Sequence, residues 1–272
     1  ATSDVYKRQS HQIINKEVIT LMSRKNLIVG QSGGPTTVIN SSLYGVVSEG
    51  RRHPETIDRI YGMINGIEGF LNNTILDFSE ALPGEKLDGL KFTPGAYLGS
   101  CRYKLPESLE DPVYPKLFEK FNEMNIGWFF YIGGNDSMDT VSKLSRYAAQ
   151  TGSDIRIIGE PKTIDNDLVH TDHTPGFGSA ARYVASTVRE ITIDANVYEK
   201  KSVTIVEIMG RHAGWLTAAS ALARKYTGDN PLLIYLPETA FDQESFLKAV
   251  EKSFEKNCNV IVCVSEGIHD AE

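Results

Sequence analysis

A polar loop at residues 161–167 carries the side chains best suited to chemistry in this chain. It reads Pro-Lys-Thr-Ile-Asp-Asn-Asp and follows an apolar run at 155–159 that is typical of a buried parallel strand. Open α/β sheets bind ligands at the carboxyl ends of their strands. Asp165 and Asp167 offer two carboxylates, which suit either general-base catalysis or a metal ion. Lys162 adds the positive charge that an anionic substrate needs.

Two glycine-containing loops have the same setting, after a strand-like run and before a helix-like one. One is Gly-Gly-Asn-Asp-Ser at 133–137, and we expect Ser137 to cap the amphipathic helix predicted at 138–150. The other is Gly-Gln-Ser-Gly-Gly-Pro at 30–35. Glycine lets the backbone approach a ligand closely, and the N–H groups of a helix N-terminus bind phosphate. Three such loops together predict a binding site for a phosphorylated ligand.

Alternating strand-like and helix-like segments predict the elements that position these loops. The expected strands are 26–30, 128–132, 155–159, 203–208, 232–236 and 260–264. The expected helices are 38–51, 113–125, 138–150, 179–198, 214–224 and 243–256, the last with Asp242 as its N-cap. This alternation is typical of parallel sheets covered by helices. We therefore predict an α/β protein of two doubly wound, Rossmann-like domains with mainly parallel sheets.

The expected domain organisation has three parts, and both ends of the chain read as unnatural. Residues 1–21 are predicted to be a non-native or disordered extension, because the segment 4–9 matches the translation of a transposon adapter used in DNA library preparation. The first domain is expected at 22–175 and the second at 176–272. The second is predicted to be incomplete through C-terminal truncation, because the sequence ends on a loop directly after a predicted strand.

Composition favours a cytoplasmic enzyme over a nucleic-acid or membrane protein. The chain has 272 residues, 41% of them hydrophobic, and a formal net charge of −7. Nucleic acids and anionic membranes both select for basic surfaces, so neither is an expected partner. No signal peptide and no membrane-length apolar run is recognisable. The three cysteines form no CxxC pair, which fits free thiols in a reducing cytoplasm.

From about residue 25 to residue 267 the chain resembles the phosphofructokinases. The resemblance is carried by six motifs in order: 30–34, 98–102 (Leu-Gly-Ser-Cys-Arg), 133–137, 161–167, 209–211 (Met-Gly-Arg) and 265–267 (Ser-Glu-Gly). It implies subunits of two α/β domains with the active site in the cleft between them. It also implies Mg²⁺-dependent in-line transfer of a phosphoryl group to the 1-hydroxyl of fructose 6-phosphate, a step of glycolysis.

The resemblance assigns roles to individual residues. Asp165 matches the base that takes the proton of the sugar hydroxyl, and Arg102 matches the arginine that neutralises the transferred phosphoryl group. The positions expected to bind fructose 6-phosphate are Thr163, Ile164, Asp165, Met209, Gly210, Arg211 and Glu266. Those expected to bind the phosphoryl donor are Gly33, Gly34, Gly134, Asp136, Ser137 and Lys162.

Two positions indicate which donor is used. The ATP-using branch of the family has glycine where this chain has Asp136 and Lys162. A carboxylate at Asp136 would occupy the space of the α-phosphate of ATP and repel its charge. Lys162 would supply a cation to pyrophosphate, which has no adenosine to anchor it. The pair therefore resembles the pyrophosphate-dependent branch, and both residues are expected to take part in catalysis alongside Asp165 and Arg102.

The expected magnesium ligands are Asn135 and Asp167. The family usually has aspartate at the position of Asn135, and an amide oxygen can still ligate Mg²⁺ without contributing charge. The resemblance also implies a homo-oligomer, either a dimer or a tetramer, with part of the sugar-phosphate site supplied by a neighbouring subunit.

Two alternatives to the pyrophosphate-dependent enzyme stay open. One is an ATP-dependent 6-phosphofructokinase, which an assay of both donors would distinguish. The other is a non-catalytic regulatory subunit that binds a phosphosugar. Its signature would be a lost base or a lost Met-Gly-Arg motif, whereas Asp165 and the 209–211 motif are both present.

Overall fold

The computed structural model describes residues 24–226, 229 and 232–271, which form two compact units. The units part after Pro161, so the second begins at Lys162. The sequence analysis expected the boundary between 175 and 176. The difference arises because the acidic loop is bonded to the start of the second unit: Thr163 N donates to Pro175 O at 3.0 Å and Thr163 forms a parallel bridge with Gly176.

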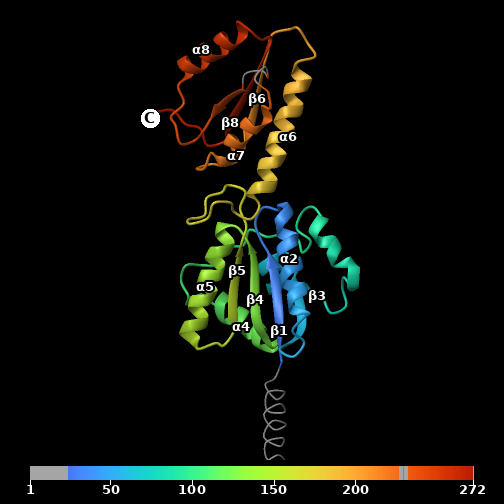
Figure 1. Ribbon diagram of the computed structural model, residues 1–272. Helices are drawn as coiled ribbons and strands as arrows, with labels where there is room; N and C mark the ends of the chain where they lie inside the picture. The colour runs from blue at the N-terminus through green and yellow to red at the C-terminus, as the bar shows by residue number, and fades with distance from the viewer. Residues whose placement is uncertain (1–23, 227–228, 230–231, 272) are drawn as a thin grey trace, which may run out of the picture. The chain divides into compact units, whose positions relative to one another are not determined.

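Unit 1 is a five-stranded sheet with helices on both faces (Figure 1). Its strand order is β3-β2-β1-β4-β5, with β3 antiparallel to β2 and the other pairs parallel. The strands are β1 (Lys25–Gln31), β2 (Ile57–Met63), β3 (Ile75–Asp77), β4 (Ile126–Gly133) and β5 (Arg156–Pro161). The helices are α2 (Thr37–Gly50), α3 (Gly66–Leu71), α4 (Val113–Glu123), α5 (Asn135–Thr151) and the short 3₁₀ segments η1 (Gly84–Lys86) and η2 (Asp88–Phe92).

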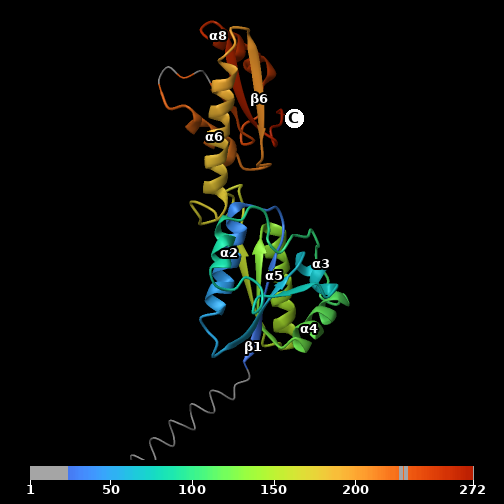
Figure 2. The same cartoon turned by 90° about the vertical axis from the view of Figure 1, so that its right-hand side faces the viewer.

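Both faces of this sheet are buried, which explains the nearly continuous apolar runs of its central strands. In β1, Ile28 packs into a cluster with residues of α4 and α5, such as Phe121 and Leu144. Its neighbour Val29 points to the opposite face and packs with residues of α2. Figure 2 shows α2 on one side of the sheet and α4 on the other. The packing fixes β1 and β4 as adjacent parallel strands, so their following loops emerge side by side.

Unit 2 contains a three-stranded parallel sheet in the order β6-β8-β7. Its elements are α6 (Phe177–Ala195), β6 (Ser202–Ile208), α7 (Trp215–Ala218), η3 (Ala219–Ala223), β7 (Leu232–Tyr235), α8 (Gln243–Phe254) and β8 (Asn259–Ser265). The long helix α6 lies alongside the sheet within this unit (Figure 2). Val188 of α6 packs with Ile208 and Ile261 of the strands. The α8 cap follows the prediction, since Asp242 Oδ1 accepts from Ser245 N at 2.8 Å.

The predicted α/β class and mainly parallel sheets are confirmed, and each predicted strand has a counterpart. Two strands were not predicted, β2 and β3. The helix predicted at 214–224 is wrong as a single α-helix, because one α-helical turn in α7 passes into the 3₁₀ segment η3.

Some predictions fall outside these observations. The extension predicted at residues 1–21 lies outside the described residues. Within the part of the chain that the structure describes, no helix is both long and apolar enough to cross a membrane.

Candidate active site

The two glycine loops of unit 1 meet at the carboxyl ends of β1 and β4. Gln31 and Ile132 are paired at the end of these parallel strands, so the following residues leave the sheet together. Gly33 has a positive φ of 79°, a conformation that glycine adopts without strain, and it lies beside the backbone N of Gly134. A Cβ at Gly133 would lie 2.7 Å from Ser32 O. Glycine is thus required for the close approach of these loops, and Gly34 follows in the same exposed turn.

The start of α5 differs in one detail from the prediction. The N-cap is Gly134, whose side chain cannot accept a hydrogen bond, and Asn135 and Asp136 form the first helical positions. Ser137 is therefore inside the helix and does not cap it. Its side chain is buried, and among the described residues its Oγ has no hydrogen-bond partner. The first turn presents backbone N–H groups without intrahelical acceptors, together with the exposed amide of Asn135.

The loop that carries Arg102 is fastened to the same edge. Ser100 Oγ donates to Gly33 O at 2.6 Å, and Gly33 N donates to Cys101 O at 3.4 Å. Ser32 Oγ also donates to Cys101 O at 3.3 Å. Arg102, which follows directly, is exposed. Arg102 therefore directly follows Cys101, a residue that these hydrogen bonds hold against the loop after β1.

A lysine that the sequence analysis did not single out joins this group. Lys104 Nζ lies 3.1 Å from Asp136 Oδ1, and both side chains are exposed. The only signal in the sequence was its position two residues after Arg102. Unit 1 therefore contains an edge at which glycine-containing loops, helix N–H groups, two cations and one carboxylate occur together, a combination suited to a polyanion.

In unit 2 the acidic loop is held in a fixed conformation by its own amide. Asn166 has a left-handed φ of 58°, and its Oδ1 accepts from Thr174 N at 2.9 Å. Thr174 Oγ1 donates to Thr163 O at 2.9 Å, and Thr163 Oγ1 accepts from Asp165 N at 3.1 Å. Asn166 and Thr174 were missed as positioning residues, although asparagine is a common residue at positive φ.

The electrostatic surroundings of Asp165 favour a proton acceptor. Burial raises the pKa of the Asp165 carboxyl, and the neighbouring charges of Asp167 and Glu266 raise it further. Arg211 and Lys162 oppose the shift, because their positive charges stabilise the ionised form. Burial in turn lowers the pKa of the Lys162 ammonium, and Asp165 partly offsets that effect. A half-buried carboxylate with a raised pKa is a suitable general base.

The loops after β6 and β8 form the other half of the unit 2 edge. Their last strand residues, Ile208 and Ser265, are paired, so Met209-Gly210-Arg211 and Glu266 leave the sheet side by side. Glu266 Oε1 accepts from Gly210 N at 3.1 Å, and Ser265 Oγ donates to Gly210 O at 2.7 Å. Gly210 has a φ of 123°, which a side chain would strain. Met209 and Arg211 are exposed at this edge.

The predicted site residues therefore gather in two sets. Unit 1 brings together Gly33, Gly34, Arg102, Gly134, Asn135, Asp136 and Ser137. Unit 2 contains Lys162, Thr163, Ile164, Asp165, Asp167, Met209, Gly210, Arg211 and Glu266, of which Arg211, Glu266 and Lys162 act electrostatically on Asp165. Over the described ranges, no group of three or more His, Cys, Asp or Glu side chains is arranged to hold a metal ion.

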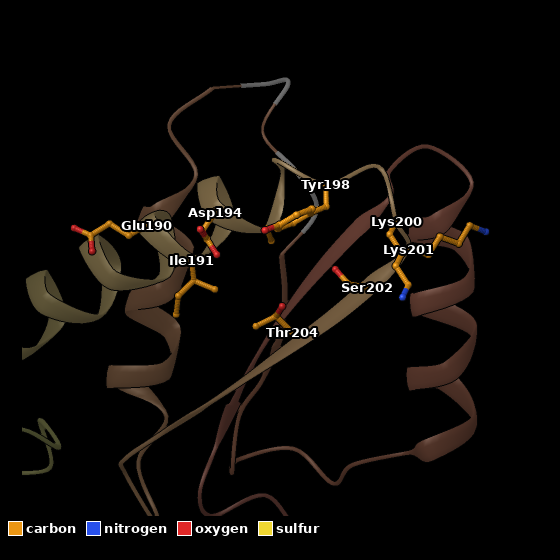
Figure 3. A pocket seen from close by; sticks show the side chains of 9 residues that line it. Glu190, Ile191, Asp194, Tyr198, Lys200, Lys201, Ser202 and Thr204 are labelled. Carbon is orange, nitrogen blue, oxygen red and sulfur yellow. The ribbon is translucent and has the colours of Figure 1, made fainter.

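A cavity in unit 2 lies away from the Asp165 loop. It has a volume of about 630 Å³ and is lined by residues of the α6 C-terminal half and the start of β6, including Glu190, Asp194, Lys201 and Thr204 (Figure 3). The acidic loop instead joins the N-terminal end of α6 at Gly176. A helix of 19 residues is about 28 Å long, so this cavity is separate from the Asp165 edge.

Comparison with known proteins identifies a family for these two sets of residues. Residues 26–272 match the phosphofructokinase family. Over 251 residues the chain is 44% identical to the pyrophosphate–fructose 6-phosphate 1-phosphotransferase of Rhodospirillum rubrum, covering 92% of this chain and 60% of that protein. It is likewise 44% identical over 254 residues to the enzyme of the same name from Xanthomonas campestris, with the same coverage.

The solved structures agree with the sequence relatives. The pyrophosphate-dependent phosphofructokinase from Marinobacter aquaeolei superposes with a TM-score of 0.82 at 42% identity, covering 90% of this chain and 61% of that one. The chain thus spans about 60% of the length of the curated relatives it matches. The match over nearly all of the described sequence, in both units, shows that this chain belongs to the phosphofructokinase family.

Proposed function

We propose that the protein transfers a phosphoryl group from pyrophosphate to the 1-hydroxyl of fructose 6-phosphate, giving fructose 1,6-bisphosphate and phosphate. The observation that carries the proposal is the setting of Asp165, a half-buried carboxylate whose pKa is raised by burial and which interacts electrostatically with Lys162 and Arg211. The names of the 44% identical relatives support the same reaction. One phosphoanhydride bond of pyrophosphate is broken and one phosphate ester of the sugar is formed, and we propose that the step runs in both directions.

On the acceptor side, Asp165 accepts the proton of the sugar 1-hydroxyl as that oxygen attacks the phosphorus. Its fixed backbone, bonded through Thr163 Oγ1, keeps the carboxylate in one orientation. Arg211 binds the phosphate group of the sugar phosphate through its positive charge. Glu266 accepts hydrogen bonds from the hydroxyl groups of the sugar. The other proposed contacts of the sugar are Thr163, Ile164, Met209 and Gly210.

On the donor side, pyrophosphate contacts the backbone of Gly33, Gly34 and Gly134 together with Ser137 in the first turn of α5. Helix N-termini stabilise anions through unpaired N–H groups and the helix dipole. Arg102 neutralises the charge that develops on the transferred group. Lys162 holds pyrophosphate, and Asp136 discriminates against ATP.

Magnesium is the proposed cofactor, with Asn135 and Asp167 as its protein ligands. Both side chains are exposed and offer oxygen atoms. Mg²⁺ commonly uses one or two carboxylates together with substrate phosphates and water, so a site with few protein ligands fits this ion. When bound, it neutralises phosphate charge during transfer. We further propose a cytoplasmic homo-oligomer.

Steady-state kinetics with fructose 6-phosphate and either donor test the proposal. Pyrophosphate should support turnover far better than ATP, and Asp165→Asn should abolish most of that turnover while leaving binding of fructose 6-phosphate nearly unchanged. Preference for ATP would favour the ATP-dependent alternative. Binding of the sugar phosphate without turnover with either donor would favour the regulatory alternative.

A further inference from the structure

We propose that Lys104 is a donor-specificity residue that makes the carboxylate of Asp136 compatible with a pyrophosphate ligand. This inference rests on the proposed function. Its structural basis is the ion pair between Lys104 Nζ and Asp136 Oδ1 at 3.1 Å, which lies at the N-terminus of α5 beside the glycine loops. Lys104 neutralises the charge of Asp136, so that the carboxylate does not repel the phosphate oxygens of the ligand.

The pair stands at an edge that we propose binds an anion, where an uncompensated carboxylate would repel the bound ligand. Asp136 lies in the first turn of α5, one residue from Asn135 and two from Gly134. Pyrophosphate carries several negative charges, so an uncompensated Asp136 would repel it as well as ATP. A cation held on Asp136 removes most of that penalty for the small donor. The bulk of the carboxylate still occupies space that a nucleotide would need.

The position of Lys104 is set by bonds on both sides of it in the chain. Before it, Cys101 is fastened to the β1 loop by the hydrogen bonds from Ser32 and Gly33 to its carbonyl. After it, Leu105 is buried and its carbonyl accepts from Lys143 Nζ at 3.0 Å. Only three residues, 102–104, span these two attachments. The backbone of Lys104 is thereby held over the start of α5.

Lys143 anchors this loop to the same helix that carries Asp136. Its side chain is only 2% exposed, and its Nζ contacts Glu107 Oε1 and Asp139 Oδ2, each at 2.7 Å. Asp139 and Lys143 are one turn apart on α5, whereas Glu107 and Leu105 belong to the loop. One buried ammonium thus ties the loop of Arg102 and Lys104 to the helix of Asp136.

Stability alone gives a weak reason for the Lys104–Asp136 pair. The two side chains are 70% and 71% exposed, and exposed ion pairs contribute little to folding because water and salt screen them. A pair of this kind matters most when a charged ligand displaces the surrounding water. The geometry therefore points to a role in the ligand complex, where charge-assisted hydrogen bonds are stronger.

Isothermal titration calorimetry with Mg²⁺ and inorganic pyrophosphate tests the assignment by a double-mutant cycle. Lys104→Met should weaken pyrophosphate binding about tenfold, the size of one charge-assisted contact. In an Asp136→Asn background the same change should weaken binding less than about threefold, because no charge is left to neutralise. Lys104→Arg should retain most of the affinity. Lys116→Met, at an exposed position on α4, is the matched control and should bind as wild type does.

The outcomes separate this inference from the function on which it rests. If wild type binds pyrophosphate but Lys104→Met binds equally well, the role of Lys104 is refuted and the proposed function stands. An equal loss in both backgrounds would also overturn the inference, because Lys104 would then act independently of Asp136. If wild type itself fails to bind pyrophosphate, the proposed function fails and this inference with it.

Discussion

Removing the charge of Asp136 should relax the choice of phosphoryl donor, and the structure sets the size of the change. Two unit charges about 4 Å apart interact by about 1 kcal/mol in water and about 4 kcal/mol at an effective dielectric constant of 20. The Asp136 side chain is 71% exposed, so the lower figure applies. Because Lys104 offsets part of that charge, Asp136→Asn should raise the ratio of ATP to pyrophosphate use, measured as kcat/KM, by no more than about fivefold.

Asp136→Gly separates the charge of this residue from its bulk. It removes the side chain as well, so the ratio should rise further than in Asp136→Asn if the carboxylate also fills space needed by the α-phosphate. Glycine in the first turn of α5 costs about 0.5–1 kcal/mol of helix stability, so melting temperatures should be compared alongside the kinetics. An unchanged donor ratio in both variants, with the fold intact, would refute the reasoning.

Three further changes probe the base, the carboxylate beside it and the lysine that anchors the loop of Arg102 and Lys104. Asp165→Asn should lower turnover by about 10²–10⁴-fold, and an unaltered kcat would contradict this. The same variant should have a higher melting temperature at neutral pH, because burial disfavours the ionised carboxylate in the folded state. Asp167→Asn should move the acid limb of the pH–rate profile to lower pH, because loss of that negative charge lowers the pKa of Asp165. The base then stays ionised at lower pH, and a shift of the acid limb to higher pH would contradict this sign. Lys143→Met should weaken protection of residues 101–107 in hydrogen exchange and raise the KM for pyrophosphate, whereas Lys116→Met should do neither.

The arrangement of the loops was predictable where it depends on local sequence. Strand, glycine loop and helix follow one another directly at 30–35 and 133–137, so the sequence order alone predicts a phosphate-binding edge. The acidic loop was equally clear, because its residues are consecutive. Its assignment to the second unit was not, because that depends on the bonds of Thr163 to Pro175 and Gly176.

Features that depend on distant pairings were missed for a physical reason. Strand β2 contains the charged pair Asp58 and Arg59, which breaks the apolar run expected of a central strand; Arg59 instead pairs with Asp77 of β3 at 2.9 Å. Lys104 and Lys143 read as ordinary charged residues, since Asp136, the partner of Lys104, and Leu105 and Glu107, the loop partners of Lys143, lie more than 30 positions away along the chain. The N-cap of α5 was misassigned to Ser137, because capping preference ranks serine above glycine but ignores where β4 ends.

The reverse reaction tests the central claim most directly, because only a pyrophosphate-dependent enzyme can run it without a nucleotide. The protein would be mixed with fructose 1,6-bisphosphate, inorganic phosphate and Mg²⁺ and followed by ³¹P nuclear magnetic resonance, with Asp165→Asn as the control. The account predicts a growing pyrophosphate signal with wild type and almost none with the variant. Absence of pyrophosphate, together with formation of ATP when ADP replaces phosphate, would contradict it.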